Sequence, residues 1–198
     1  IDNIAYILIN GLDKYIFLTK YMNERIMKKD RPYIIIEGIA PKFPLVSNKR
    51  KSNSNVKIIM YAGGVYEKYG IHTLVEGFRA IKNENIELDI YGPGDAVQYV
   101  KSSSLVDRRI RYCGVAPADE MLQLEQSASL LVITRPTDEE YTKYSFPSKI
   151  IEYMASGTPV LSTKLAGIPD EYRNHIFWFD EGSVSAVSSR LKEVIEKD

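Results

Sequence analysis

The sequence has little that would place it in a membrane, in an oxidising compartment or around a metal ion. Cys113 is the one cysteine among 198 residues, so no internal disulfide can form and we expect a reducing compartment. Nothing resembles paired cysteine or histidine metal ligands. No apolar run approaches the ~18 residues that cross a bilayer. We therefore expect a cytoplasmic protein that is not integral to a membrane.

The charge is balanced overall but unevenly distributed. There are 26 basic and 26 acidic residues, yet residues 1–70 hold twelve Lys and Arg against six acids. A basic region can bind nucleic acid or an anionic membrane surface. Lysine clusters such as 49–51 are more often solvated loops, so we expect no nucleic-acid partner.

What the sequence does contain is an alternation of short apolar runs with segments of helical period. This pattern predicts an α/β protein with a Rossmann-like, doubly wound parallel sheet. The predicted strands cover residues 14–18, 33–36, 57–62, 87–91, 110–113, 130–134, 159–161 and 176–179. The predicted helices cover residues 20–29, 71–81, 118–127, 148–156 and 183–196. Thr19 is the expected cap of the first helix, and Leu74, Val75 and Phe78 are the expected inward face of the second.

Two glycine-rich segments follow predicted strands, at the edge of the sheet where ligands of such folds bind. Glycine lets backbone amides approach an anion, so residues 63–70 form either a phosphate cradle or a tight turn. They are not a P-loop, because no Gly-Lys-Ser/Thr follows. Residues 92–94 give half of a dinucleotide fingerprint, but Val97 replaces its third glycine, which disfavours NAD binding.

Residues 145–157 carry the most informative pattern, Ser-Phe-Pro-Ser-Lys followed by a helix that ends at a glycine. Lys149 lies in the first turn, where the helix dipole disfavours a cation by about 0.3–1 kcal/mol unless an anion compensates. Glu152 lies three residues later on the same face. The two residues either bind one ligand that has a phosphate and vicinal hydroxyls, or form an ordinary surface ion pair. The expected inward face of this helix consists of Ile150, Ile151, Met154 and Ala155.

The succession of these motifs resembles the C-terminal, donor-binding half of GT-B glycosyltransferases of the retaining family 4, also called glycosyltransferase group 1. The most specific block is Tyr144-Ser-Phe-Pro-Ser-Lys-Ile-Ile-Glu152-Tyr-Met-Ala-Ser-Gly-Thr-Pro-Val160, and the resemblance covers about residues 56–196. Residues 12–38 look like the last β-α-β element of the N-terminal domain in that family. We therefore expect residues 1–40 to be a remnant of the acceptor domain, 41–55 a linker and 56–198 the nucleotide-sugar-binding domain. The start at Ile1 fits a piece of a longer protein.

The resemblance implies a role for the matching residues. Glu152 corresponds to the second glutamate of the family's E-x7-E motif, which in relatives accepts hydrogen bonds from the nucleotide ribose. Backbone amides of residues 146–148, with Lys149, would face the phosphates or the sugar, and residues 114–115 would lie near the base. The residues expected to bind the donor are Gly63, Gly64, Lys68, Arg135, Tyr144, Phe146, Ser148, Lys149 and Glu152.

The sequence also departs from the family pattern. Tyr144, a neutral phenol, stands where the first glutamate is expected, which leaves the donor sugar open. Gly64 replaces an expected arginine, and Lys68 stands one residue before the expected lysine. Arg135 and Lys149 could substitute as phosphate partners, in the manner of a subgroup that makes capsular or other surface polysaccharides.

We expect the full protein to transfer a hexose, with retention, from a nucleotide sugar to a glycan or lipid-linked acceptor, and this chain alone to bind donor without turnover. Its partners would be the donor, the acceptor and its missing N-terminal domain, through which it could associate peripherally with the inner face of the membrane. No cofactor or metal is expected, because cations and a helix end would neutralise the departing diphosphate. His72 and His175 are interpreted as surface residues, so no catalytic residue is assigned. The alternatives are a non-catalytic sugar-nucleotide-binding module and, ranked lower, a dinucleotide-binding Rossmann domain.

Overall fold

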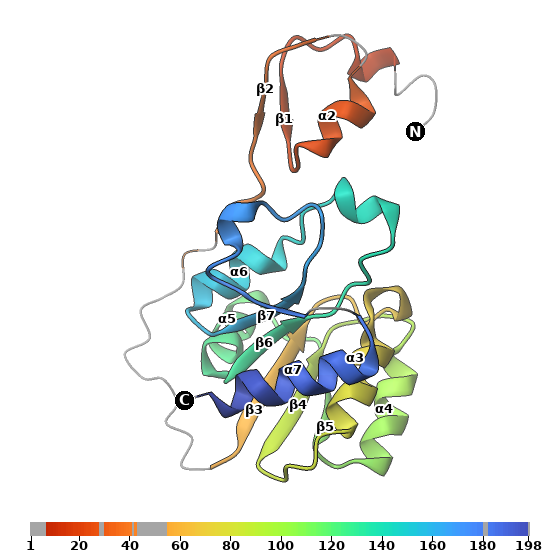
Figure 1. The fold of residues 1–198 in the computed structure, drawn as a ribbon, viewed down its shortest axis with the longest axis vertical. Coiled ribbons are helices and arrows are strands. Elements are labelled where there is room, and N and C mark those ends of the chain that lie inside the picture. The colour runs from red at the N-terminus through yellow and green to blue at the C-terminus, as the bar shows by residue number, and fades with distance from the viewer. Residues whose placement is uncertain (1–6, 28–29, 41, 43–54, 180–181, 198) are drawn as a thin grey trace.

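The computed structural model describes residues 7–27, 30–40, 42, 55–179 and 182–197, which form two parts of unequal size (Figure 1). The smaller part contains two parallel strands, β1 (Tyr15–Phe17) and β2 (Tyr33–Ile35), joined through helix α2 (Tyr21–Ile26). Both strands lie within the segments predicted for them. The predicted cap is wrong: Lys20 is the residue before the helix, and the Thr19 hydroxyl instead donates to the Lys143 carbonyl, 2.8 Å away, in the larger part.

One face of the small two-stranded sheet is open. Ile16 pairs in register with Ile34, so their side chains share a face, and they are 65% and 56% exposed. Parallel sheets are normally covered on both faces. Among the described residues of the small part, this face of the sheet is therefore left uncovered.

The larger part is built on six parallel strands in the order β5-β4-β3-β6-β7-β8. The strands are β3 (Lys57–Ala62), β4 (Ile86–Tyr91), β5 (Ile110–Gly114), β6 (Leu130–Ile133), β7 (Val160–Thr163) and β8 (Phe177–Phe179). The chain runs outward from β3 to one edge, returns to the other side of β3 and runs outward again. This arrangement confirms the predicted doubly wound α/β sheet.

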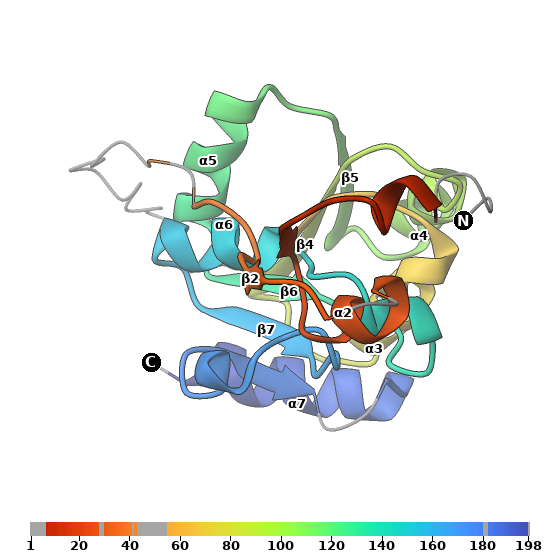
Figure 2. The ribbon, with the colours of Figure 1, turned by 90° about the horizontal axis from the view of Figure 1, so that it is seen from above.

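Helices cover both faces of this sheet (Figures 1 and 2). One face is covered by α3 (Ile71–Arg79), α4 (Val97–Val106) and α7 (Val184–Glu196), and the other by α5 (Ala118–Ser127) and α6 (Lys149–Ser156). Short 3-10 turns lie in three of the loops, at η1 (Glu67–Tyr69), η2 (Glu140–Lys143) and η3 (Asp170–Tyr172). Among the described residues, none of the helices combines the length and the apolar character that would let it cross a bilayer.

The inward faces of the helices agree with the prediction for α3 and correct it for α6. Leu74, Val75 and Phe78 are fully buried. In α6, Ile150 is buried and Ile151 and Met154 pack half-buried against the core, as predicted, whereas Ala155 is exposed and Tyr153, which was not predicted to face inward, is fully buried. The phenol of Tyr153 can be buried because it finds polar partners on β3, described below.

Helix α4 was not predicted from the sequence. Its buried positions are Val100 and Ser103, so it lacks the broad apolar stripe that marks an amphipathic helix. The helix is held by contacts with the neighbouring α3 and β5 instead of by its own pattern.

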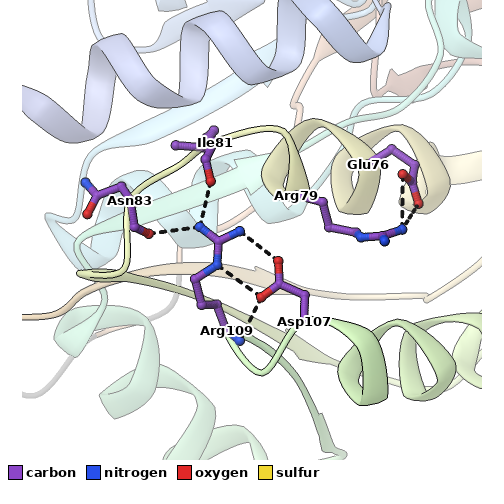
Figure 3. A network of polar contacts seen from close by, with 6 residues as sticks. All are labelled: Glu76, Arg79, Ile81, Asn83, Asp107 and Arg109. Atoms are coloured by element: carbon purple, nitrogen blue, oxygen red, sulfur yellow. Dashed lines mark hydrogen bonds and ion pairs between the residues drawn. The ribbon is translucent and has the colours of Figure 1, made fainter.

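At the amino end of the sheet, Arg109 closes a network that joins the starts of β4 and β5 (Figure 3). Its guanidinium donates to the carbonyls of Ile81 and Asn83, at 2.7 and 2.9 Å, and to both carboxylate oxygens of Asp107, at 3.0 and 2.7 Å. It also lies 5.0 Å from the ring centre of Phe78. The hydrogen bonds from Arg109 to the carboxylate lower the pKa of Asp107.

Most of the predicted linker, residues 41–55, lies outside the described residues; only Lys42 and Asn55 of it are described. The boundaries predicted at residues 40 and 56 stay predictions.

Candidate functional site

The order of the strands points to the carboxyl ends of β3 and β6. Successive connections leave these neighbouring strands toward opposite faces of the sheet, and ligands of doubly wound proteins bind in the crevice at such a point. The two loops that follow these strands touch each other: the Thr134 hydroxyl donates to the carbonyl of Tyr69, at 3.2 Å. The predicted phosphate cradle and the segment that leads to α6 therefore meet at one place.

The glycine loops after β3 and β4 pack backbone against backbone. The Gly63 amide donates to the Tyr91 carbonyl at 3.0 Å, and the Val65 amide donates to the Pro93 carbonyl at 2.8 Å. Gly92 has φ +125°, and a Cβ on it would lie 1.7 Å from the Gly63 carbonyl oxygen. This close contact requires a glycine at position 92. Packing alone therefore accounts for the first glycine of the apparent dinucleotide fingerprint.

Of the two glycines predicted to line a diphosphate, only Gly64 has a spare amide. The Gly63 amide is already bonded, whereas in the part of the chain that the structure describes the Gly64 amide has no acceptor. The carbonyl of Gly64 accepts a hydrogen bond of 2.8 Å from the Tyr61 hydroxyl, whose pKa is raised by burial. A neutral phenol thus holds the carbonyl of Gly64, while the amide of the same residue is left without an acceptor among the described residues.

Cations and aromatic rings gather around Gly64. The Arg135 guanidinium lies 4.5 Å from the ring centre of Tyr69, and the Lys68 ammonium lies 5.4 and 5.7 Å from the rings of Tyr69 and Tyr66. A Cβ on Gly64 would be 2.6 Å from the Tyr66 ring, so that ring fills the space of a side chain at position 64. Positive charge is therefore present here although the arginine expected at position 64 is not.

Helix α6 is fixed to the end of β3 by Tyr153. The Tyr153 hydroxyl donates to the Ala62 carbonyl at 3.0 Å and accepts from the Ala62 amide at 2.8 Å, and this side chain is fully buried. Among the described residues, the amides of Ser148 and Lys149 at the start of the helix have no acceptor. The helix end thus offers donors beside the glycine loop.

Lys149 lies between two carboxylates. Its Nζ is 2.5 Å from Oε1 of Glu152, one turn along α6, and 3.1 Å from Oε1 of Glu125 on α5. Glu125 is completely buried, and burial raises its pKa to about 7 against the opposing effect of Lys149. The pair Lys149–Glu152 is recognisable in the sequence, but Glu125 is not, because an acid in an amphipathic helix normally faces solvent.

The other predicted donor residues lie on the segment between β6 and α6. Phe146 is buried against Tyr172, at 5.7 Å between ring centres, so only its backbone can face a ligand, while Ser148 is exposed. The Tyr144 hydroxyl donates to Glu140 at 3.3 Å, and Arg25 of the small part lies 5.2 Å from the ring centre of Tyr144. Nothing in these contacts tests the donor-binding roles, which stay predictions.

A cavity of about 560 Å³ lies between the small part and the loops after β6 and β7. None of the nine predicted donor residues lines it. It adjoins their segment, because Gly167 in its wall leaves no room for a Cβ, which would lie 2.6 Å from the Ser145 carbonyl oxygen. Its charged lining residues are Lys20, Glu37, Lys164, Asp170, Glu171 and Arg173.

The histidines and the cysteine take no part in this site. His72 and His175 are exposed, as predicted, and the His72 ring stacks on Tyr99 at 3.7 Å between ring centres. Cys113 is free and exposed. Within the described ranges, no group of three or more His, Cys, Asp or Glu side chains could hold a metal ion, and the expected independence of metal stays a prediction.

Comparison with known proteins gives the same picture of the larger part. A family described as "Glycosyl transferases group 1" matches residues 56–197. The amylovoran biosynthesis glycosyltransferase AmsK of Erwinia amylovora is 26% identical over 141 residues, which are 67% of this chain and 34% of that protein.

Solved structures of low sequence identity share the fold. Sucrose-phosphate synthase from Thermosynechococcus elongatus has a TM-score of 0.76 at 17% identity, covering 98% of this chain and 52% of that one. Anabaena HepE in complex with UDP and glucose has a TM-score of 0.71 at 18% identity, covering 98% of this chain and 56% of that one. The chain thus spans about a third to a half of the lengths of these proteins.

Proposed function

Because the chain belongs to the group 1 glycosyltransferases, we propose that it is the donor-binding half of an enzyme that transfers a hexose, with retention, from a nucleotide sugar to a glycan or lipid-linked acceptor. The relative named for amylovoran biosynthesis supports a role in the synthesis of a surface polysaccharide. The fold shared with a structure that holds UDP and glucose supports a nucleoside diphosphate as the carrier. The described part alone would bind donor and not turn it over.

This proposal rests on the hydrogen-bond donors and cations that lie together at the carboxyl ends of β3 and β6. There the connections leave toward opposite faces of the sheet. The amide of Gly64, for which the described residues supply no acceptor, lies in the same loop as the ammonium of Lys68, and the guanidinium of Arg135 lies beside that loop. Amides and cations together bind phosphate oxygens and stabilise the charge that a leaving diphosphate develops. We assign the diphosphate to this loop, with no metal needed.

The ribose would lie at Glu152, whose side chain is 27% exposed. Its helix is tied to the same strand end by Tyr153, so the carboxylate and the glycine loop keep a fixed spacing. A carboxylate can accept from both vicinal hydroxyls of a ribose. In this proposal the diphosphate and the ribose of the ligand lie along one rigid edge of the sheet.

The test is calorimetric titration of the chain with UDP and GDP. We expect one of them to bind, Arg135→Ala to weaken binding by about 10-fold or more, and Lys68→Ala to weaken it less, because a lost charged hydrogen bond costs about 1.5–3 kcal/mol. Lys192→Ala, an exposed cation on α7, is the matched control and should bind as the wild type does. Absence of binding by the wild-type chain to either nucleotide would contradict the proposal.

Tyr144 supports a second candidate function, a sugar-nucleotide-binding module without catalysis. It stands where the family pattern has a glutamate, and its hydroxyl is engaged with Glu140. A protein that includes the complete N-terminal half separates the two functions. Transfer of radiolabelled sugar from the bound donor supports the enzyme, whereas binding without transfer supports the module.

A further inference from the structure

Lys149 points its charge into the contact between α5 and α6. Its ammonium lies within 3.1 Å of both Glu125 and Glu152 and 5.7 Å from the ring centre of Tyr153. The side chain is 31% exposed, although the helix start where it originates is open to solvent. Its hydrogen-bonding capacity is thus directed to two carboxylates.

Glu125 is what holds Lys149 there. A carboxylate with no exposed surface needs a cation or several donors, and Lys149 is the cation that reaches it. Oε2 of Glu125 has no hydrogen-bond partner among the described residues, so its attachment depends on the bond from Oε1 to Lys149. Glu125 therefore fixes the position of the ammonium from the buried side.

Glu152 is held in turn from the exposed side. One oxygen, Oε1, accepts from Lys149, and in the described part of the chain Oε2 has no protein donor. The carboxylate is thus fixed in one orientation with one oxygen available. A glutamate without this contact would lose rotamer freedom when a ligand bound to it.

We propose that Glu125 and Lys149 are positioning residues for Glu152, and that Lys149 acts on the ribose end of a nucleoside diphosphate through Glu152 instead of contacting its phosphates. This inference rests on the proposed function. It differs from the expectation drawn from the sequence, in which Lys149 faces an anion. The two glutamates are the anions that compensate the unfavourable position of the Lys149 charge at the helix start.

The test combines protein variants with a change in the ligand. Wild type, Lys149→Met and Arg135→Ala are titrated with the diphosphate that binds, UDP or GDP, and with its 2′,3′-dideoxy form, which keeps both phosphates and lacks the hydroxyls. We expect Lys149→Met to lower affinity for the natural diphosphate by about 10-fold, the order of the cost of fixing one long side chain. It should change affinity for the dideoxy form by less than about 2-fold. Arg135→Ala should lower both affinities by the same factor.

Equal losses for the two ligands in Lys149→Met would overturn the proposal, because they would mean a phosphate contact. If Lys149→Met fails to unfold cooperatively, Lys149→Gln, which retains a donor, replaces it under the same criterion. A wild-type chain that binds neither UDP nor GDP refutes the proposed function itself, and with it this inference. If the wild type binds a nucleotide and Lys149→Met loses equal affinity for the natural and the dideoxy diphosphate, the inference is refuted and the proposed function is not.

Glu125 supplies an independent readout. The titratable groups that face it are Lys149, Glu152 and Tyr153, all on α6. Glu125→Gln keeps an oxygen for Lys149 and should retain affinity within about 3-fold, whereas Glu125→Leu should match the 10-fold loss of Lys149→Met. Between pH 6 and 8 the terminal phosphate of the ligand ionises with either protein, so the pH profile of Glu125→Gln is the baseline. The affinity of the wild type should depart from this baseline by up to about 3-fold as Glu125 ionises. The same pH profile in both proteins would contradict the role of Glu125.

Discussion

The two charged networks of the larger part differ in how completely their groups are paired. At the amino end of the sheet, Arg109 satisfies both oxygens of Asp107 and two carbonyls (Figure 3). Between α5 and α6, one ammonium serves two carboxylates, and an oxygen of Glu125 is left without a partner among the described residues. In the first network both carboxylate oxygens and both carbonyls are paired, and we interpret it as structural. The second has capacity left, and it lies beside the site.

Substitution of Arg109 should give the largest effect on stability. Arg109→Met leaves Asp107, which is 16% exposed, without its cation and leaves two carbonyls without a donor. We expect the free energy of unfolding to fall by about 2–4 kcal/mol, measured by urea denaturation at pH 7. Affinity for the nucleotide should not change.

The control for Arg109 is Arg79→Ala. The pair of Arg79 with Glu76 is 35% and 42% exposed, so its loss should cost less than about 1 kcal/mol. If Arg109→Met and Arg79→Ala lower the free energy of unfolding by similar amounts, the Arg109 network is no more important for stability than a surface ion pair. Because the pKa of Asp107 is lowered, its share of the stability is present at neutral pH and is lost as the pH falls through the lowered value.

Tyr153 tests whether α6 is held by its phenol or by the charged cluster. Tyr153→Phe removes two buried hydrogen bonds to Ala62 and should lower the free energy of unfolding by about 1–3 kcal/mol. Tyr112→Phe, which loses one part-buried bond to Gly92, is the matched control and should cost less. Lys149→Met removes the cation of the buried Glu125, and a larger loss of unfolding free energy than in Tyr153→Phe would mean that the charged cluster holds α6 more than the phenol does.

The effect of Glu125→Gln on stability depends on pH. Burial raises the pKa of Glu125 from 4.5 to about 7. Between these two pH values the folded state therefore holds a proton that the unfolded state has released. Its stability relative to the glutamine variant should therefore be highest near pH 4.5 and should decline as the pH rises through about 7. Thermal unfolding of both proteins at pH 5 and pH 8 measures this difference. A constant difference in melting temperature would contradict it.

Much of the fold could be predicted because strand and helix periods are local. Val75 and Phe78 of α3 occupy a regular apolar stripe, so the helix was recognisable. Helix α4 was not, because its buried residues include Ser103 and its stability comes from neighbouring elements. The strand order, which locates the candidate site, depends on contacts between distant segments. No single segment of the sequence predicts it.

The segments that form the site could be predicted from the sequence, but the contacts between their side chains could not. Glycine after a strand and a lysine at a helix start are local signals, and they led to residues 63–70 and Lys149. The partner Glu125 lies 24 residues before Lys149 on another helix, and only the packing of α5 on α6 brings it into reach. Thr19 likewise bonds a carbonyl 124 residues away instead of capping its own helix.

The glycine contacts bear on how family alignments of such chains should be interpreted. Added carbons at Gly92 and Gly94 would lie 1.7 and 2.0 Å from backbone oxygens, whereas at Gly182 nothing lies within 4 Å. Invariance at the first two positions would persist in a descendant that had lost its substrate, because chain geometry alone enforces it. Drift at Glu152 or Arg135 with those glycines intact would be the mark of a pseudoenzyme.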